Sequence, residues 1–81
     1  MNPEGWLLDP NGRWLLHFHK DPISWKRWPK FYLDKWSIPS RGTPYNLKNR
    51  RKVELEPAIE TWTELIQNGW REVDDQFGQA A

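Results

Sequence analysis

The stretch that decides the fold is residues 6–19, WLLDPNGRWLLHFH. Its centre, Asp9-Pro10-Asn11-Gly12, places proline where a type I turn needs φ near about −65° and glycine where the chain must take a positive φ. Short hydrophobic runs flank this turn on both sides, so the stretch predicts a β-hairpin with a glycine bulge after the turn. In the second strand one set of side chains, Trp14, Leu16 and Phe18, alternates with another, Arg13, Leu15, His17 and His19. We expect the first set to face the core.

Residues 57–68 predict a single helix. Pro57 suits its first position, and an apolar stripe follows at helical spacing, made of Ala58, Ile59, Trp62, Leu65 and Ile66. Gly69 is a natural left-handed stop, and Trp70 is placed to fold back onto the last turn of the helix.

The remaining segments predict the rest of a small sheet. Residues 30–36 and 51–55 alternate as strands, residues 70–73 can add a last short one, and residues 37–44 form a loop with two prolines and a glycine. The predicted fold class is therefore α+β: an antiparallel sheet of three to five strands with an N-terminal hairpin and one C-terminal helix packed on a face. We expect a single domain over residues 1–73 and a flexible tail over 74–81. The expected core is Trp14, Leu16, Phe18, Phe31, Leu33, Ile59, Trp62, Leu65 and Trp70.

Composition narrows the classes of protein. The chain has 81 residues and no cysteine, which excludes disulfides, thiolate metal sites and cysteine nucleophiles. Small secreted domains usually need such cross-links, so we expect a cytoplasmic protein. No segment is typical of an export signal, and no apolar run approaches the roughly 20 residues of a membrane span.

Charge is distributed unevenly along the chain. Residues 1–52 carry eleven Lys and Arg against four Asp and Glu, whereas residues 53–81 carry one Arg against seven acids. Either the two halves neutralise one another, or one of them presents a charged face to a partner. Glu56, Glu60 and Glu64 form a ridge on the predicted helix, which is either a solvated face or a surface for a basic partner.

The most function-like feature is a set of basic residues interleaved with tryptophans. Two segments carry it, residues 25–30 and residues 48–52, and they supply the predicted partner-binding residues: Trp25, Lys26, Arg27, Trp28, Lys30, Lys48, Arg50, Arg51 and Lys52. We predict a small non-enzymatic binding or regulatory module that acts on another protein. The alternative is single-stranded nucleic acid, because bases stack on indoles while Lys and Arg neutralise phosphates. The prediction depends on exposure of Trp25 and Trp28. A homodimer is also possible, because a small sheet leaves edges to cover.

Catalytic and metal-binding patterns are weak. The sequence has no phosphate-binding glycine loop, nucleophile elbow or zinc-protease motif, so we predict no enzyme and no cofactor. His17 and His19 project from the same strand face, with Asp21 next if the strand continues, and together they could hold a divalent metal. Further ligands are not evident, and a solvated strand face is the favoured interpretation.

Several of these segments together resemble a known family. They are Gly5-Trp6-Leu7-Leu8-Asp9 with Gly12-Arg13-Trp14, the Asp21-Pro22-x-Ser24-Trp25 connector, and Arg50-Arg51 leading into Ala58-x-x-x-Trp62-x-x-Leu65-x-x-x-Gly69-Trp70. This pattern, over residues 5–73, resembles a family of short cyanobacterial proteins known as a domain of unknown function. The resemblance implies a cyanobacterial or cyanophage source and a cytoplasmic setting, and it brings no known activity or ligand.

Overall fold

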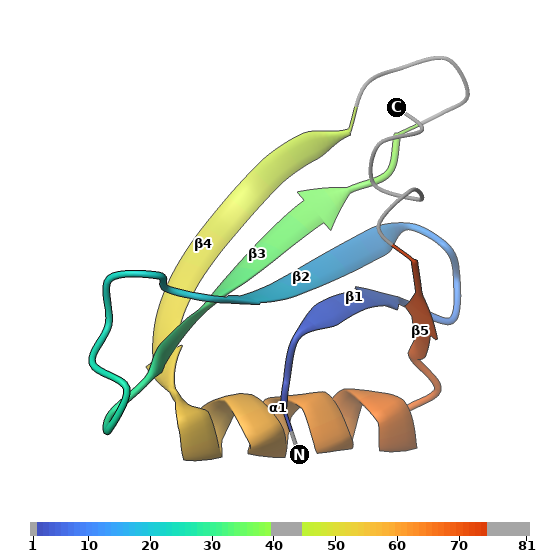
Figure 1. The fold of residues 1–81 in the computed structure, drawn as a ribbon. Coiled ribbons are helices and arrows are strands. Elements are labelled where there is room, and N and C mark those ends of the chain that lie inside the picture. The colour runs from blue at the N-terminus through green and yellow to red at the C-terminus, as the bar shows by residue number, and fades with distance from the viewer. Residues whose placement is uncertain (1, 40–44, 75–81) are drawn as a thin grey trace.

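Five strands and one helix make up the fold of the computed structural model, which describes residues 2–39 and 45–74. The elements are β1 (Gly5–Leu8), β2 (Trp14–Lys20), β3 (Lys30–Ser37), β4 (Asn46–Glu54), α1 (Leu55–Gln67) and β5 (Arg71–Val73). All strand pairs are antiparallel, in the order β4-β3-β2-β1-β5, and α1 crosses one face of the sheet (Figure 1). The predicted α+β class, the N-terminal hairpin and the single helix are confirmed.

The turn of the β1–β2 hairpin forms as its residues predict. Gly12 has φ +70°, and its N–H donates to the carbonyl of Asp9 at 3.0 Å. The Asp9 carboxylate also accepts hydrogen bonds from the backbone N–H groups of Arg13 at 2.6 Å and Trp14 at 3.0 Å. The aspartate thus satisfies backbone donors that the tight turn leaves without a strand partner.

The helix ends at the predicted left-handed glycine, Gly69, and the hydrogen bonds there form a Schellman motif. Gly69 has φ +96° and donates to the carbonyl of Ile66 at 3.1 Å, while Trp70 donates to the carbonyl of Leu65 at 3.0 Å. The start differs from the prediction, because α1 begins at Leu55 directly after β4 rather than at Pro57. Pro57 is still in the first turn, where a helix needs no N–H from it.

The core lies between α1 and the sheet. Its buried members are Leu7, Phe18, Phe31, Leu33, Ala58 and Trp62, and the partly buried side chains packed on them are Leu16, Val53, Leu55, Leu65 and Trp70. Two predicted core residues, Trp14 and Ile59, are only partly buried and do not join this cluster. Trp14 is the first residue of β2, opposite Ser37, and Lys35 Nζ lies 4.3 Å from the centre of its ring.

The opposite face of the sheet is more buried than its sequence pattern predicts. Leu15 was expected to point away from the core, yet it is fully buried there. In the sheet register its neighbours on this face are Leu8 and Trp36, so apolar side chains from three strands cover one another. We call this side the open face, because α1 packs on the other one.

Two further predictions concern the ends of elements. β4 runs from Asn46 to Glu54 and is longer than the predicted strand at 51–55, and its register with β3 shifts at Lys35 and Trp36. The predicted tail, apart from Asp74, and part of the predicted 37–44 loop lie outside the described residues. Within residues 2–39 and 45–74, no helix has the length and hydropathy of a membrane span.

Candidate functional site

The loop between β2 and β3, residues 21–29, carries the two tryptophans on which the predicted site depends. Ile23, Trp25 and Trp28 are 85%, 72% and 58% exposed, so these large apolar side chains are left out of the core. The Trp25 and Trp28 ring centres lie 6.3 Å apart. The backbone N–H of Trp28 donates to the backbone carbonyl of Trp25 at 3.1 Å. Burial of these indoles would have removed the main support for the site, and the structure shows them exposed.

The neck of this loop is held by a compact set of hydrogen bonds. The Asp21 N–H donates to the Lys30 carbonyl at 2.8 Å, and Ser24 Oγ donates to the Asp21 carbonyl at 2.8 Å. The same Ser24 Oγ accepts the Lys30 N–H at 3.1 Å, and the Asp21 carboxylate accepts the Ile23 N–H at 3.1 Å. The exposed indoles therefore stand on a fixed base, which lowers the entropic cost of binding through them.

A first hollow, of about 300 Å³, lies on the basic side of the loop. It is lined by Asp21, Ile23, Ser24, Trp25, Trp28, Lys30 and Lys52. Lys52 reaches it from β4 and binds the buried Asp21 carboxylate at 2.8 Å, while Lys30 binds Glu54 at 2.9 Å. The hydrogen bond from Lys52 lowers the pKa of Asp21, and the same contact raises the pKa of Lys52.

A second hollow, of about 540 Å³, lies on the other side of Trp28 and is acidic. Its lining comes from the loop, the end of β4 and the first turns of α1: Arg27, Trp28, Pro29, Glu54, Leu55, Glu56, Pro57 and Glu60. The Arg27 guanidinium carbon lies 5.7 Å from the centre of the Trp28 ring. Trp28 lines both hollows, so one exposed indole stands between a lysine-lined and a glutamate-lined surface.

The nine predicted partner-binding residues are only partly brought together. Four of them line the first hollow: Trp25, Trp28, Lys30 and Lys52. Arg27 lines the second hollow, and Lys26 is exposed on the loop but lines neither hollow. The remaining three lie along β4: Arg50 on the open face, Arg51 on the helix side of the sheet, and Lys48 where the register shifts.

The uneven charge of the chain is not cancelled by ion pairs between its halves. The ion pairs of the described residues are His19–Asp34, Arg50–Asp34, Lys52–Asp21 and Lys30–Glu54. The last of these joins a cation of the first half to an acid of the second half. The other three lie within residues 1–52, so the acids of α1 and several cations of the loop and β4 remain available at the surface.

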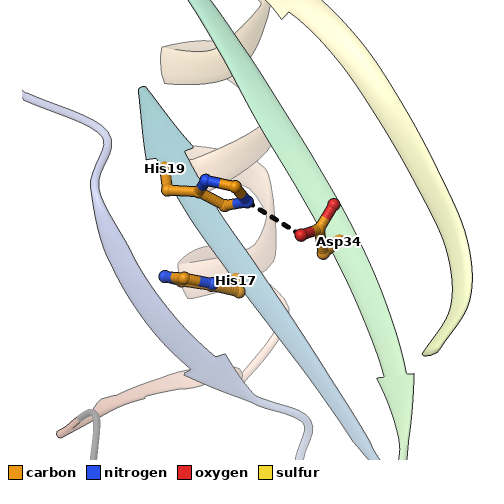
Figure 2. Close-up of side chains that lie close together, drawn as sticks. All are labelled: His17, His19 and Asp34. Carbon is orange, nitrogen blue, oxygen red and sulfur yellow. Dashed lines mark hydrogen bonds and ion pairs between the residues drawn. The ribbon is translucent and has the colours of Figure 1, made fainter. Parts of the chain in front are cut away.

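A separate cluster of titratable side chains lies on the open face. His17, His19 and Asp34 have ligand atoms within 4.8 Å of one another (Figure 2). His19 Nε2 lies 2.8 Å from Asp34 Oδ2, and Arg50 donates to both oxygens of Asp34 at 2.7 Å and 2.8 Å. Burial alone would raise the pKa of Asp34, but the hydrogen bonds from Arg50 and His19 outweigh it and lower the pKa.

His17 sits in a stack of aromatic rings in this cluster. Its ring is parallel to Trp6 at 3.9 Å and close to parallel to His19 at 4.4 Å. Burial lowers the pKa of His17 to about 4, and the neighbouring His19 contributes in the same direction. The imidazole is therefore neutral at physiological pH.

The third residue beside the two histidines is Asp34, so the prediction of Asp21 in this place was wrong. Asp34 of β3 lies beside the histidines, whereas Asp21, just after the end of β2, binds Lys52 instead. The arrangement fits a metal poorly, because both Asp34 oxygens already accept hydrogen bonds from Arg50 and one of them also contacts His19 Nε2. Its chemistry is that of a buried carboxylate held by the Arg50 guanidinium and by a hydrogen bond with His19. The pairing of Asp34 with Arg50 had no local signal in the sequence, because it depends on strand register.

The structure thus defines a small α+β protein with a five-stranded antiparallel sheet, one helix and an exposed tryptophan loop. The chain belongs to the family described as "Protein of unknown function (DUF1651)", whose match covers residues 4–77. This confirms the predicted membership of a family without assigned function. No curated protein and no solved structure matches the chain.

Proposed function

We propose that the chain is a small non-enzymatic binding module that acts on another protein through its tryptophan loop, residues 21–29. The observation that carries the proposal is the exposure of Ile23, Trp25 and Trp28 on a loop whose neck is held by hydrogen bonds. Clustered exposed aromatic residues are typical anchors of protein interfaces, because burying them removes a large apolar area from water.

The charges around Trp28 favour a protein over a nucleic acid as the partner. Lys30 and Lys52 line one side of the indole, whereas Glu54, Glu56 and Glu60 line the other. A phosphate backbone carries one sign of charge and is repelled by the acidic side. A protein surface can offer a base to Glu56 and Glu60, which have no ion pair with another described residue, and an apolar side chain to the indoles.

Other parts of the proposal rest on the sequence. A cytoplasmic location is supported by the lack of cysteine in so small a domain, and a cyanobacterial source by the resemblance of residues 5–73 to short proteins from those organisms. We also propose that the chain has no catalytic activity and needs no cofactor, because the carboxylate in the cluster of His17, His19 and Asp34 is already occupied by Arg50.

The test is a comparison of captured partners between the wild-type chain and the Trp25→Ala/Trp28→Ala double variant. We expect the wild type to retain a reproducible protein from native lysate and the double variant to lose it, with unchanged circular dichroism. A matched control is Ile66→Ala, which removes a large apolar side chain that is 42% exposed in the last turn of α1. This control should keep the partner.

Two results would contradict the proposal. In the first, the double variant retains every protein that the wild type captures. In the second, the wild type binds a single-stranded oligonucleotide with an affinity that falls steeply with salt, and the double variant does not. That result would establish the alternative function, because a steep salt dependence reports the number of phosphates contacted.

A further inference from the structure

The edge strand β4 offers a second surface, next to the tryptophan loop. Within the described sheet β4 pairs with β3 alone, so the backbone groups on its other side have no strand partner. Apart from Val53, all its residues are exposed. A nine-residue edge of this kind can accept an added strand.

The charge of β4 decides what kind of strand fits. The strand carries Lys48, Arg50, Arg51 and Lys52 against a single acid, Glu54. Asp34 and Asp21 engage Arg50 and Lys52, whereas Lys48 and Arg51 have no ion pair with another described residue. The edge therefore keeps an excess of positive charge that an acidic strand would complement.

A second copy of the chain does not fit this edge. If two β4 strands paired antiparallel about Arg50, Arg50 would face Arg50 and Lys48 would face Lys52. Moving the centre to Arg51 places Arg50 opposite Lys52. Like charges directly opposite destabilise a strand pair, so self-pairing through β4 is disfavoured in the registers that use its middle.

The C-terminal part of β4 adjoins the tryptophan loop. Lys52 lines the first hollow together with Trp25 and Trp28, and Glu54 lines the second hollow with Trp28. A strand added along β4 would therefore bring one of its ends to the exposed indoles. One added segment could therefore pair with the main chain of β4 and also make an apolar contact with the tryptophan loop.

We propose that the partner supplies an extended acidic segment that adds to the sheet along β4, with a bulky apolar side chain at the end that reaches Trp25 and Trp28. The proposal rests on the proposed function and specifies the chemistry of its partner. Backbone hydrogen bonds to β4 would supply affinity, and acids opposite Lys48 and Arg51 would supply selectivity.

The test uses a fluorescein-labelled peptide in which a run of glutamates is framed by valines, with leucine at one end. Fluorescence anisotropy with the full chain should show saturable binding. Lys48→Glu/Arg51→Glu should weaken binding by about tenfold or more, and a peptide with lysines in place of the glutamates should regain affinity for this variant. Both substitutions lie on an exposed strand, and circular dichroism checks that the fold is kept.

A second peptide separates strand addition from general attraction between charges. N-methylation of the backbone nitrogens that face β4, which are every second one in an added strand, keeps every charge and removes the donors to β4, so it should abolish binding. In addition, hydrogen exchange should show protection of β4 amides with the unmodified peptide.

Equal binding of the methylated and unmodified peptides would overturn the proposal, as would the absence of any binding to the wild-type chain. Preference for an oligothymidylate of similar charge, with the same dependence on Lys48 and Arg51, would overturn it in favour of a nucleic-acid edge. If the peptide fails while capture of a protein still depends on Trp25 and Trp28, the proposed function stands and this inference is wrong.

Discussion

The neutral His17 makes stability depend on pH in a defined window. In the folded protein the partly buried imidazole lies between Trp6 and His19, and burial lowers its pKa from 6.5 to about 4. The unfolded chain therefore takes up a proton as the pH falls below 6.5, while the folded chain does so only near 4. The stabilisation that depends on a neutral His17 is fully present above pH 6.5. It is lost as the pH falls from 6.5 towards 4, because protons then bind the unfolded chain more tightly than the folded one.

The size of this loss follows from the pKa difference. At about 1.4 kcal/mol for each tenfold change in proton affinity, a pKa lowered from 6.5 to about 4 corresponds to roughly 3 kcal/mol. Because the ring is only partly buried, solvent screening reduces the expected loss to about 1.5 kcal/mol. For a domain of 81 residues this is a fall in Tm of about 6–12 °C.

The assay is urea unfolding, followed by tryptophan fluorescence, between about pH 7 and about pH 4.5. The comparison is the wild type with His17→Phe, which keeps a ring against Trp6 and cannot be protonated. Asp21 and Asp34 have pKa values lowered below 3.8, so their contribution is lost only at more acidic pH. We expect the variant to lose about 1.5 kcal/mol less than the wild type over this range. Equal losses in the two proteins would refute the reasoning.

The contacts of the described residues also set the cost of three sets of substitutions and the response to zinc. Gly12→Ala should cost about 1 kcal/mol in urea unfolding, because φ is +70° and no atom crowds the new Cβ, which leaves only the strained backbone. Phe18→Ala should cost about 3–5 kcal/mol, since this fully buried ring packs edge-on against a tryptophan of α1; a cost below about 1 kcal/mol would contradict its place in the core. Trp25→Ala/Trp28→Ala should change the free energy of unfolding by less than about 0.5 kcal/mol, as measured by the same assay. Zinc at neutral pH should not raise the Tm, and a rise that His17→Phe abolishes would show that the histidine cluster binds metal.

Local signals in the sequence predicted the parts of the fold that depend on backbone conformation. The two glycines with positive φ at the hairpin and the helix end, Gly12 and Gly69, lie where turn and capping chemistry require them. The apolar stripe of the helix placed Trp62 against the sheet, because helical periodicity alone selects one face.

Side-chain contacts between neighbouring strands could not be predicted from the sequence. Leu15 is fully buried on the open face because the register places Trp36 and Leu8 beside it, and register is not written in local alternation. The same reason applies to Asp34, whose partners come from β2 and β4. In the candidate site, the tryptophans and lysines were predicted from composition, whereas the acidic side of Trp28 depends on how α1 follows β4.

The distribution of tryptophans bears directly on the proposed function. The core of this small sheet is built by phenylalanines, leucines and Trp62, and it forms without Trp25 and Trp28. Exposed indoles are unfavourable in water, because each presents roughly 150–250 Å² of mostly apolar surface, so folding gives no reason for two of them on one loop. The proposed binding role would explain the two exposed indoles. The hydrogen bonds of Asp21 and Ser24 already hold the loop, so little of it would have to be ordered when a partner binds. Loss of both indoles should therefore reduce binding and leave folding almost unchanged, a separation that a purely structural role for this loop would not produce.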